Sequence, residues 1–202
     1  MKIIISVFTV IVVILLFFLF NPSSYKIKNA DPTGETIVCF GDSLTYGTGA
    51  AKRMDYPSQL SRMIGVEIIN AGVPGDTTAT ALNRIDELIE MNPRIVLITL
   101  GGNDLKNRVK KEMVFKNFEK IINIIQDNGA LVIIGGIDVP FWGRGFSRAY
   151  VELSEKTGSV LIQNIFKDII GKPQLMSDSI HPNGQGYTIM ANHFYKALKP
   201  YL

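Results

Sequence analysis

Apolar residues fall into two alternating patterns along this chain after residue 35. The first pattern is a short, continuous apolar run, which is typical of a parallel strand buried on both faces. Four clear runs and a weaker fifth have this character: TIVCF (36–40), VEIIN (66–70), RIVLITL (94–100), ALVII (130–134) and, the weaker, SVLIQ (159–163). They predict the strands of a mostly parallel sheet.

The second pattern is an apolar stripe at helical spacing between or after the strands. One stripe ends before Asn92-Pro93, a second stops at Asn128-Gly129, and a third follows Pro182-Asn183; proline and glycine commonly mark such helix ends. The stripes consist of Leu82, Ile85, Leu88 and Ile89; Phe118, Ile121, Ile122 and Ile125; and Tyr187, Met190, Ala191, Phe194 and Leu198. Strands alternating with helices predict one α/β domain over residues 36–202, with helices on both faces of the sheet.

The longest apolar run covers residues 3–20 and contains no charged residue, proline or glycine. Its length is close to the roughly 20 apolar residues that cross a bilayer as a helix. Lys2 precedes the run, as in a secretory signal, but no A-x-A-like cleavage site follows it. The interpretation is an N-terminal hydrophobic helix that acts as an uncleaved signal anchor over residues 1–20. A cleaved signal peptide and a buried core helix are the alternatives.

This interpretation predicts an extracytoplasmic domain, anchored by a single pass at the periplasmic face of the inner membrane or at the cell surface. Cleavage of the segment would make the protein secreted. Residues 21–35 are polar and contain proline, glycine and serine without apolar periodicity. They predict a linker between the membrane and the domain.

Composition removes several classes of function. The 202 residues suffice for one domain with a sizeable core. The formal net charge is only +3, and no basic run supports nucleic-acid binding. One cysteine and two histidines cannot build an ordinary Cys/His zinc site, and a disulfide within the chain is impossible.

Glycine-rich polar segments follow four of the predicted strands, at the strand ends where open α/β sheets bind ligands. Glycine lets the backbone approach a ligand closely. The segments are Gly41-Asp42-Ser43-Leu44, AGVPGDT (71–77), Gly101-Gly102-Asn103-Asp104 and Gly135-Gly136-Ile137-Asp138. Their common location at one edge of the sheet predicts a binding or catalytic site.

Ser43, His181 and Asp178 are the candidate catalytic residues. A serine hydroxyl becomes a good nucleophile when a base removes its proton. His181 follows Asp178 by three residues, so a turn would place both side chains on one face. Asp178 would then hold Nδ1 and leave Nε2 free to act as the base. The backbone N–H groups of Ser43 and Gly75 and the side-chain amide of Asn103 are candidate donors to an oxyanion.

Four motifs in this order resemble the blocks of the GDSL, or SGNH, hydrolases: Gly-Asp-Ser-Leu (41–44), Pro-Gly-Asp-Thr (74–77), Gly-Gly-Asn-Asp (101–104) and Asp-Ser-Ile-His-Pro-Asn (178–183). Their order and spacing are similar to the bacterial thioesterase I–lysophospholipase branch and its arylesterase relatives. The resemblance implies a three-layer α/β/α, flavodoxin-like fold with five parallel strands. It also implies Ser43 as nucleophile, His181 as base, Asp178 as its orienting acid and an oxyanion hole of Ser43, Gly75 and Asn103, without a metal or organic cofactor.

Phe141, Trp142 and Phe146 follow the fourth predicted strand. We interpret them either as rim residues that bind an acyl chain or a membrane surface, or as a loop whose aromatics cover the core. With the predicted anchor, they favour a serine esterase that hydrolyses lipid-like esters, such as lysophospholipids or short-to-medium acyl esters.

Three alternatives remain open from sequence. The first is an O-acetyl esterase acting on carbohydrate, and the second is a catalytically inactive, membrane-tethered binding module. The third is a flavodoxin-like nucleotide binder, which is disfavoured because the glycines around Gly47–Lys52 lack the spacing of a dinucleotide or phosphate loop.

Overall fold

The computed structural model of the protein describes residues 25–139 and 145–202. The predicted signal anchor (1–20) lies outside these residues, as do Phe141 and Trp142. Within the described ranges, no helix has both the length and the apolarity needed to cross a membrane.

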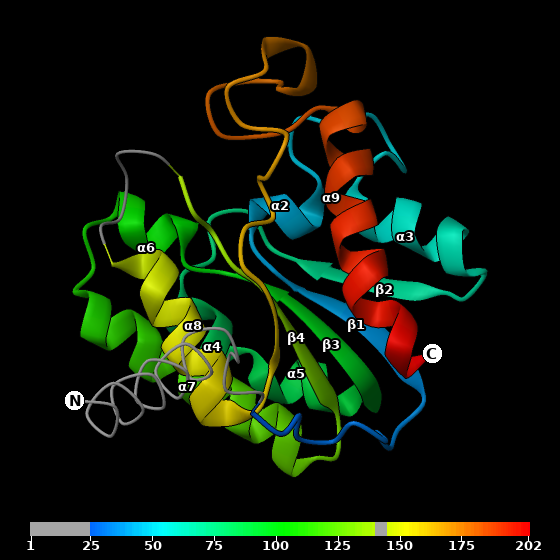
Figure 1. The fold of residues 1–202 in the computed structure, drawn as a ribbon, viewed down its shortest axis with the longest axis vertical. Coiled ribbons are helices and arrows are strands. Elements are labelled where there is room, and N and C mark those ends of the chain that lie inside the picture. The colour runs from blue at the N-terminus through cyan, green and yellow to red at the C-terminus, as the bar shows by residue number, and fades with distance from the viewer. Residues whose placement is uncertain (1–24, 140–144) are drawn as a thin grey trace, which may run out of the picture.

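Five parallel strands form one sheet in the order β2-β1-β3-β4-β5 (Figure 1). The strands are β1 (Thr36–Gly41), β2 (Ile68–Gly72), β3 (Pro93–Thr99), β4 (Leu131–Gly135) and β5 (Val160–Ile162). All five predicted strands, including the weakest, are confirmed. The order is that of flavodoxin-like folds, in which ligands bind at the carboxyl ends of the strands on either side of the reversal, here β1 and β3.

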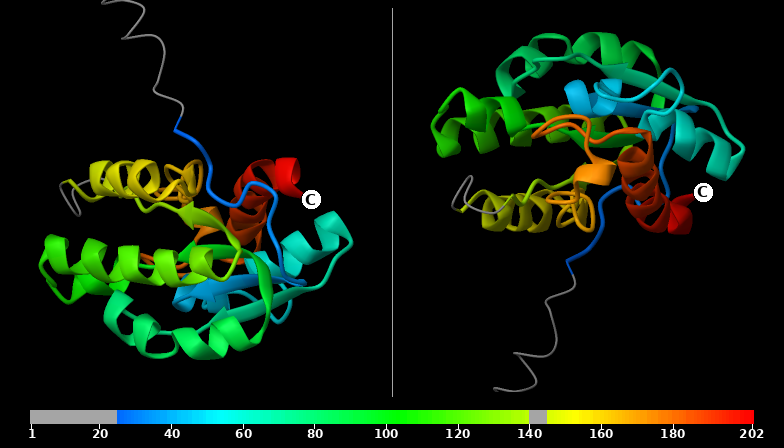
Figure 2. Two further views of the ribbon diagram at one scale, coloured as in Figure 1. Left: turned by 90° about the horizontal axis from the view of Figure 1, so that it is seen from below. Right: turned by 90° about the horizontal axis from the view of Figure 1, so that it is seen from above.

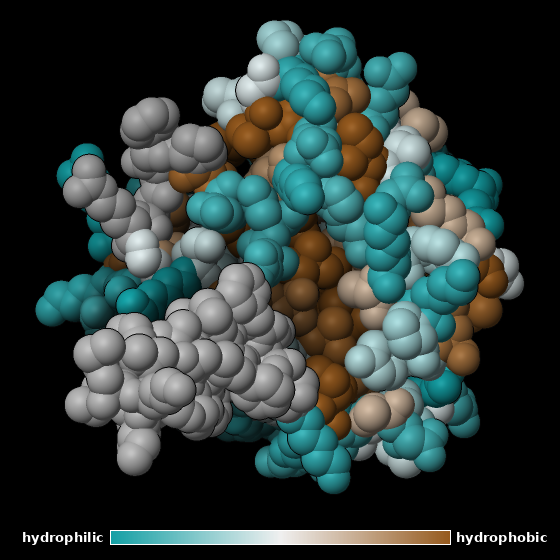
Figure 3. Space-filling view, viewed as in Figure 1, coloured by the Kyte–Doolittle hydropathy of each residue, from teal (hydrophilic) through white to brown (hydrophobic). Residues whose placement is uncertain are grey.

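The continuous apolarity of the strands follows from their position between two layers of helices. Val96, Leu97 and Ile98 in the middle of β3 are fully buried, whereas the three residues of the edge strand β5 are only partly buried. The space-filling view of the face in Figure 1 shows a hydrophobic area near its middle, with hydrophilic residues above it (Figure 3).

Helices cover both faces of the sheet (Figure 2). Helices α3 and α9 pack against each other on one face, and α4, α5, α7 and α8 cover the other. The helices are α2 (Ser43–Tyr46), α3 (Tyr56–Ile64), α4 (Thr78–Asn83), α5 (Ile85–Glu90), α6 (Gly102–Lys106), α7 (Lys111–Asp127), α8 (Phe146–Thr157) and α9 (Gly184–Leu198), with the short 3-10 turns η1 (Pro173–Leu175) and η2 (Lys199–Tyr201). The predicted three-layer α/β/α architecture is confirmed.

One predicted helix is two. The apolar stripe around residues 82–89 predicted a single helix, but α4 ends and α5 begins at Arg84, which has φ −114° and ψ 21°. We attribute this break to polar contacts of the Arg84 side chain, which the spacing of the apolar residues does not indicate. Outside the helical conformation, the Arg84 side chain hydrogen-bonds to the Asp76 carboxylate and to the Gly41 carbonyl.

The other two predicted helices are confirmed. Helix α7 ends before Asn128 and Gly129, where Gly129 has φ +86°. Helix α9 begins after Asn183, whose side-chain oxygen accepts hydrogen bonds from the N–H groups of Gln185 and Gly186. Such an N-cap satisfies donors that have no partner within the first turn of a helix.

Residues 25–35, which we call the N-terminal strap, are attached to the domain rather than free as expected of a linker. The Tyr25 hydroxyl donates to the Ser159 carbonyl (2.6 Å), and the Lys28 N–H donates to the Gly158 carbonyl (2.9 Å). The Asn29 amide donates to the carbonyls of Gln126 and Ala130. These carbonyls precede β4 and β5, so the strap crosses the amino edge of the sheet (blue in Figure 1) and supplies donors that backbone carbonyls require there.

Candidate active site

The site begins at the turn between β1 and α2. Ser43 is the first residue of α2, and Asp42 caps this helix by accepting the Leu44 N–H on its carboxylate (2.9 Å). The helix ends after one turn at Gly47, which has φ +94°. Because β1 ends at Gly41, the turn places Ser43 at the carboxyl edge of the sheet.

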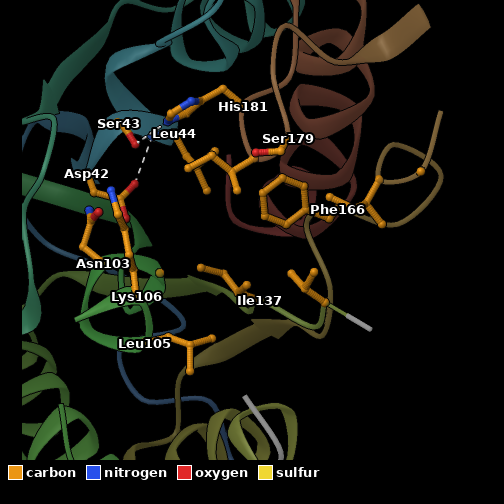
Figure 4. A pocket seen from close by; sticks show the side chains of 15 residues that line it. Asp42, Ser43, Leu44, Asn103, Leu105, Lys106, Ile137, Phe166, Ser179 and His181 are labelled. Carbon is orange, nitrogen blue, oxygen red and sulfur yellow. Dashed lines mark hydrogen bonds between the residues drawn. The ribbon is translucent and has the colours of Figure 1, made fainter. Parts of the chain in front are cut away.

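A second turn, before α9, carries His181 to the same edge. His181 Nε2 lies 3.0 Å from Ser43 Oγ (Figure 4), and its Nδ1 lies 2.7 Å from Asp178 Oδ2. The other carboxylate oxygen of Asp178 accepts the N–H groups of Ile180 (2.8 Å) and His181 (2.7 Å). The structure therefore joins the serine, the imidazole and the carboxylate in one hydrogen-bonded row.

This row has an electrostatic consequence for Asp178. The hydrogen bond from the His181 ring, helped by the Ile180 N–H, lowers the pKa of the Asp178 carboxyl from its usual 3.8 to about 2. Asp178 therefore remains an anion at neutral pH. A carboxylate in this place holds the imidazole in one orientation, with Nε2 toward the serine.

The turn that carries His181 is fixed at its base. Met176 and Pro182 form an isolated antiparallel bridge, and the Ser177 N–H donates to the His181 carbonyl (2.8 Å). The Asn183 N–H donates to the Leu175 carbonyl (2.9 Å). The position of the imidazole is thus set by backbone pairing rather than by a long loop.

Gly75 and Asn103 lie on the two segments that flank the Ser43 turn. Gly75 has φ +90° in a turn closed by the hydrogen bond from the Asp76 N–H to the Val73 carbonyl (3.1 Å). The Asn103 side-chain amide donates to the Asp76 carbonyl (2.9 Å), so the two segments are linked. Within the described residues, the N–H groups of Ser43 and Gly75 have no intramolecular acceptor, which leaves them available to a ligand.

The start of α6, which carries Asn103, depends on Gly101. This residue has φ +106°, and a Cβ atom there would lie 2.5 Å from the hydroxyl of Tyr150. That hydroxyl is buried and donates to the Leu100 carbonyl (2.6 Å). A glycine is needed because both the backbone conformation and the close approach exclude a side chain.

Three carboxylates next to the site are buried: Asp42, Asp76 and Asp104. Asp104 accepts the N–H (2.9 Å) and the hydroxyl (2.7 Å) of Thr78, which ties α6 to α4. Asp42 is only 2% exposed. Burial, together with the negative charges of Asp76 and Asp104, raises the pKa of the Asp42 carboxyl to about 7.

A pocket of about 460 Å³ opens beside Ser43 and His181 (Figure 4). Its polar lining includes Asn103, Lys106 and Ser179. The apolar lining, which predominates, is formed by Leu44, Leu105, Ile137, Val139, Phe166, Ile170 and Ile180. A concave apolar site with a few polar groups at one end is typical of a small-molecule binding site.

Phe146, one of the three aromatics expected at the rim, does not line this pocket. It is the first residue of α8, is buried, and packs edge-to-face on Phe115 with ring centroids 5.4 Å apart. The prediction that Phe146 binds substrate is therefore wrong, because its ring fills the core between α7 and α8. Phe166 and Ile170 line the pocket and were not predicted, because they lie in a segment after β5 that has no regular apolar period.

The remaining cysteine and histidine lie apart from this site. Cys39 is buried in β1, and burial raises the pKa of its thiol. The Nδ1 atom of His193, on α9, lies 3.4 Å from the Ile165 carbonyl. No group of three or more His, Cys, Asp or Glu side chains that could hold a metal occurs in the part of the chain that the structure describes.

Comparisons with known proteins agree over most of the chain. Residues 39–189 match the model of the GDSL-like lipase/acylhydrolase family. The chain is 29% identical over 190 residues to an arylesterase of Vibrio mimicus, covering 88% of this chain and 95% of that protein. It is 28% identical over 175 residues to thioesterase 1/protease 1/lysophospholipase L1 of Escherichia coli K12, covering 82% and 84%. A crystal structure of the psychrotrophic esterase EstA from Pseudoalteromonas sp., inhibited by monoethylphosphonate, matches with a TM-score of 0.75 and 28% identity, covering 81% and 96%.

Proposed function

The chain belongs to the GDSL-like lipase/acylhydrolase family, and from this premise we propose that Ser43, His181 and Asp178 are its catalytic triad. Its activity is the hydrolysis of acyl esters by a serine hydrolase. The observation that carries the assignment of residues is the row of hydrogen bonds from Asp178 through His181 to Ser43.

The first half of the reaction forms an acyl-enzyme. Ser43 Oγ attacks the ester carbonyl carbon while His181 Nε2, 3.0 Å away, takes the hydroxyl proton. The Asp178 carboxylate stabilises the imidazolium that results. When the tetrahedral intermediate collapses, the bond to the leaving oxygen breaks and His181 gives its proton to the departing alcohol.

The second half releases the acid. A water molecule gives a proton to His181 Nε2 and attacks the acyl carbon, and the proton then returns to Ser43 Oγ as the acyl bond breaks. In both halves the negative charge on the carbonyl oxygen is stabilised by the N–H groups of Ser43 and Gly75 and by the Asn103 amide. Loss of one such donor costs about 3–4 kcal/mol of transition-state stabilisation.

The pocket supports lipid-like substrates with short-to-medium acyl chains, lysophospholipids among them. Its apolar walls and its volume of about 460 Å³ exceed what an acetyl group needs. Burial of each methylene of an acyl chain contributes about 0.8 kcal/mol. An acetylated carbohydrate would instead require several hydrogen-bonding groups, and among the described lining residues only Asn103, Lys106 and Ser179 add polar side chains to those of the Ser43 turn and His181.

The assignment is tested by Ser43→Ala. We expect this variant to fold normally and to lose esterase activity by about 10⁴-fold or more, because the nucleophile is gone. Ser61→Ala, at a serine on α3, is the matched control and should keep full activity. Turnover is measured with p-nitrophenyl esters of increasing chain length, alongside labelling by a fluorophosphonate probe. Near-normal turnover or labelling of Ser43→Ala would overturn the assignment.

The same ester series separates the substrate classes. A kcat/KM that rises from acetyl toward medium chains supports the lipid-like substrate. A maximum at acetyl, together with activity on acetylated sugars, would favour the carbohydrate esterase. A folded wild-type chain that neither hydrolyses any ester nor reacts with the probe would instead be a binding module.

We also propose that residues 3–20 anchor the domain to a membrane on the extracytoplasmic side. The support is the predominantly apolar sequence of this segment, which contains no charged residue, proline or glycine. The full chain should remain with membranes after alkaline carbonate washing, and Val12→Arg combined with Leu15→Arg should release it. Mass measurement of the mature chain distinguishes an anchor from a cleaved signal peptide. Equal partitioning of the unmodified full chain and the double variant between membrane and supernatant would contradict the proposal.

A further inference from the structure

Arg84 lies behind the candidate oxyanion donors without lining the pocket itself. We infer that Arg84 is a positioning residue, which acts through Asp76 to hold the segments of Gly75 and Asn103 in place relative to Ser43. This inference rests on the proposed function, because it concerns the geometry of the oxyanion hole.

The Arg84 guanidinium connects three groups. Its Nε donates to Asp76 Oδ2 (2.7 Å), and its Nη2 lies 2.6 Å from the same oxygen. Nη2 also donates to the Gly41 carbonyl (3.1 Å), and the guanidinium carbon lies 4.1 Å from the centre of the Phe40 ring. A planar guanidinium suits such a set of contacts, whereas a lysine ammonium does not reproduce it.

Asp76 carries these contacts to the oxyanion donors. Its carbonyl accepts the Asn103 amide (2.9 Å), and its N–H closes the turn that contains Gly75. The Gly41 carbonyl, which Arg84 also binds, accepts the Val73 N–H as well (2.9 Å). Arg84 thus ties the residue that ends β1, two positions before Ser43, to the segments that carry the other two donors.

Burial distinguishes this ion pair from the exposed ones. The side chains of Arg84 and Asp76 are 16% and 8% exposed, whereas those of Arg148 and Glu152 are 84% and 62% exposed. Exposed pairs contribute little because water screens them, while a buried and hydrogen-bonded pair fixes geometry strongly. Removing one partner of a buried pair leaves an uncompensated charge.

The helix break points the same way. The sequence 82–89 has the apolar spacing of one continuous helix, yet the chain leaves the helical conformation at Arg84. At this break the Arg84 N–H donates to the Ala81 carbonyl (3.2 Å), and the Arg84 side chain hydrogen-bonds to Asp76 and Gly41. These contacts are therefore built into the fold rather than added on its surface.

The test compares Arg84→Met, Arg84→Lys and Asp76→Asn in the full chain, with kcat and KM measured on a p-nitrophenyl ester. We expect Arg84→Met to lower kcat by about 10- to 100-fold, below or at the low end of the effect of losing a whole donor. KM should change by less than about 3-fold, because the apolar pocket is untouched. Arg84→Lys, which keeps the charge, should recover part of kcat, and Asp76→Asn should resemble Arg84→Met.

Arg94→Met is the matched control. Arg94 also binds a backbone carbonyl, that of Tyr201 (3.3 Å), but at the start of β3, at the opposite edge of the sheet. Its loss should leave kcat and KM within 2-fold of the wild type. Circular dichroism and thermal melting of each variant give the folded fraction by which kcat is corrected.

A double variant tests the route through Asn103. If Arg84 acts by orienting the Asp76 carbonyl and the Asn103 amide, Arg84→Met should lower kcat much less in an Asn103→Ala background than in the wild type. Full additivity would overturn the inference, as would an unchanged kcat in Arg84→Met with only a lower melting temperature. Should Arg84→Met fail to fold, the same criteria apply to Arg84→Lys and Asp76→Asn. Activity in Ser43→Ala would count against the proposed function instead, since that variant leaves Arg84 intact.

Discussion

Asp42 caps a helix at the site although it is buried among other acidic residues. Its carboxylate caps the helix that presents Ser43, yet it is buried close to the negatively charged Asp76 and Asp104. Because burial and these charges raise the native pKa of Asp42 from 3.8 to about 7, the folded chain binds a proton that the unfolded chain releases between these values. The stability contributed by this group is therefore greatest below about pH 4 and falls as pH rises to about 7.

Replacing the charge tests this linkage. Asp42→Asn keeps an oxygen that accepts the Leu44 N–H but never ionises. We expect the stability of Asp42→Asn, measured relative to the wild type, to be greater at pH 8 than at pH 5 by up to about 2–3 kcal/mol, because only the part of the pKa change between pH 5 and about 7 contributes over this range. Urea unfolding at both pH values measures the difference. Asp86→Asn, at an exposed residue of α5, should show no such pH dependence, and an equal effect of Asp42→Asn at both pH values would contradict the prediction.

The pKa of Asp178 is shifted in the opposite direction to that of Asp42. Its native pKa of about 2 lies below the ordinary 3.8, so it stabilises the folded chain above pH 4, and this contribution is lost as pH falls toward 2. With the side chain 51% exposed, water screens the interaction, and the effect on stability is small. Its larger effect belongs to the reaction.

Asp178→Asn should therefore reduce kcat far more than stability. The amide oxygen still accepts the N–H groups of Ile180 and His181, so the turn persists. An amide facing Nδ1 no longer favours the tautomer in which Nε2 is a base, and such a change lowers kcat by about 10⁴-fold in a well-characterised serine protease. Steady-state kinetics measure kcat, and thermal melting measures stability. A loss of stability with an unchanged kcat would contradict the prediction.

At the scale of elements, the N-terminus of α9 helps to hold the turn that carries His181. The Asn183 oxygen caps α9, and its amide nitrogen donates to the Gln174 carbonyl (2.8 Å). One side chain therefore joins the helix, the turn and the preceding segment. His181 lies only two residues before it.

Asn183→Ala should lower stability by about 1 kcal/mol, the usual effect of losing an N-cap. It should also lower kcat several-fold, because the His181 turn loses one of its attachments. Asn183→Asp keeps the cap and loses only the bond to Gln174, so its stability should lie closer to the wild type. Chemical denaturation and esterase kinetics measure both effects, and an unchanged kcat in Asn183→Ala would show that the turn is held by its backbone bonds alone.

Elements with a clear apolar period were predictable from sequence, and elements set by polar contacts were not. The five strands, α7 and α9 follow from their apolar residues. The break at Arg84 depends on Asp76 and Gly41, which become its neighbours only in the folded chain. The pocket wall at Phe166 and Ile170 lies in a segment without regular period, and the burial of Phe146 depends on Phe115 in another helix.

The candidate site divides in the same way. Ser43, Gly75 and Asn103 follow β1, β2 and β3, whose carboxyl ends meet, so strand order alone predicts that they share one edge. Asp178 and His181 lie well beyond the end of β5, and backbone pairing in the turn before α9 brings them to that edge. The family resemblance read from these motifs is confirmed. What the motifs did not reveal is the layer behind them, because an ion pair between Arg84 and Asp76 has no local signature beyond two charged residues eight positions apart.

At the scale of the whole molecule, the N-terminal strap belongs to the folded domain. Ile27 packs against the core, and the strap donates several hydrogen bonds to the amino edge of the sheet. Each such bond contributes about 1 kcal/mol. Residues 25–35 therefore contribute to the stability of the folded domain, which was predicted to begin only at residue 36.

Two truncations test this boundary. A chain that begins at Tyr25 should melt close to the full chain and keep its kcat on soluble esters. A chain that begins at Glu35 should lose several kcal/mol of stability, because the donors to the carbonyls before β4 and β5 are gone. Differential scanning calorimetry and esterase kinetics compare the two, and equal melting temperatures would show that the strap contributes nothing.

If residues 3–20 anchor the chain as proposed, the strap limits how the active site can be oriented relative to the bilayer. The strap lies at the amino edge of the sheet, and Ser43 lies at the carboxyl edge, a strand length of roughly 20 Å away. If residues 3–20 sit in a bilayer as proposed, the four residues before Tyr25 reach at most about 14 Å. The active site would then face away from the bilayer that anchors the chain. Its ester substrates would come from the surrounding medium or from an opposite surface, and not from the lipids of that bilayer.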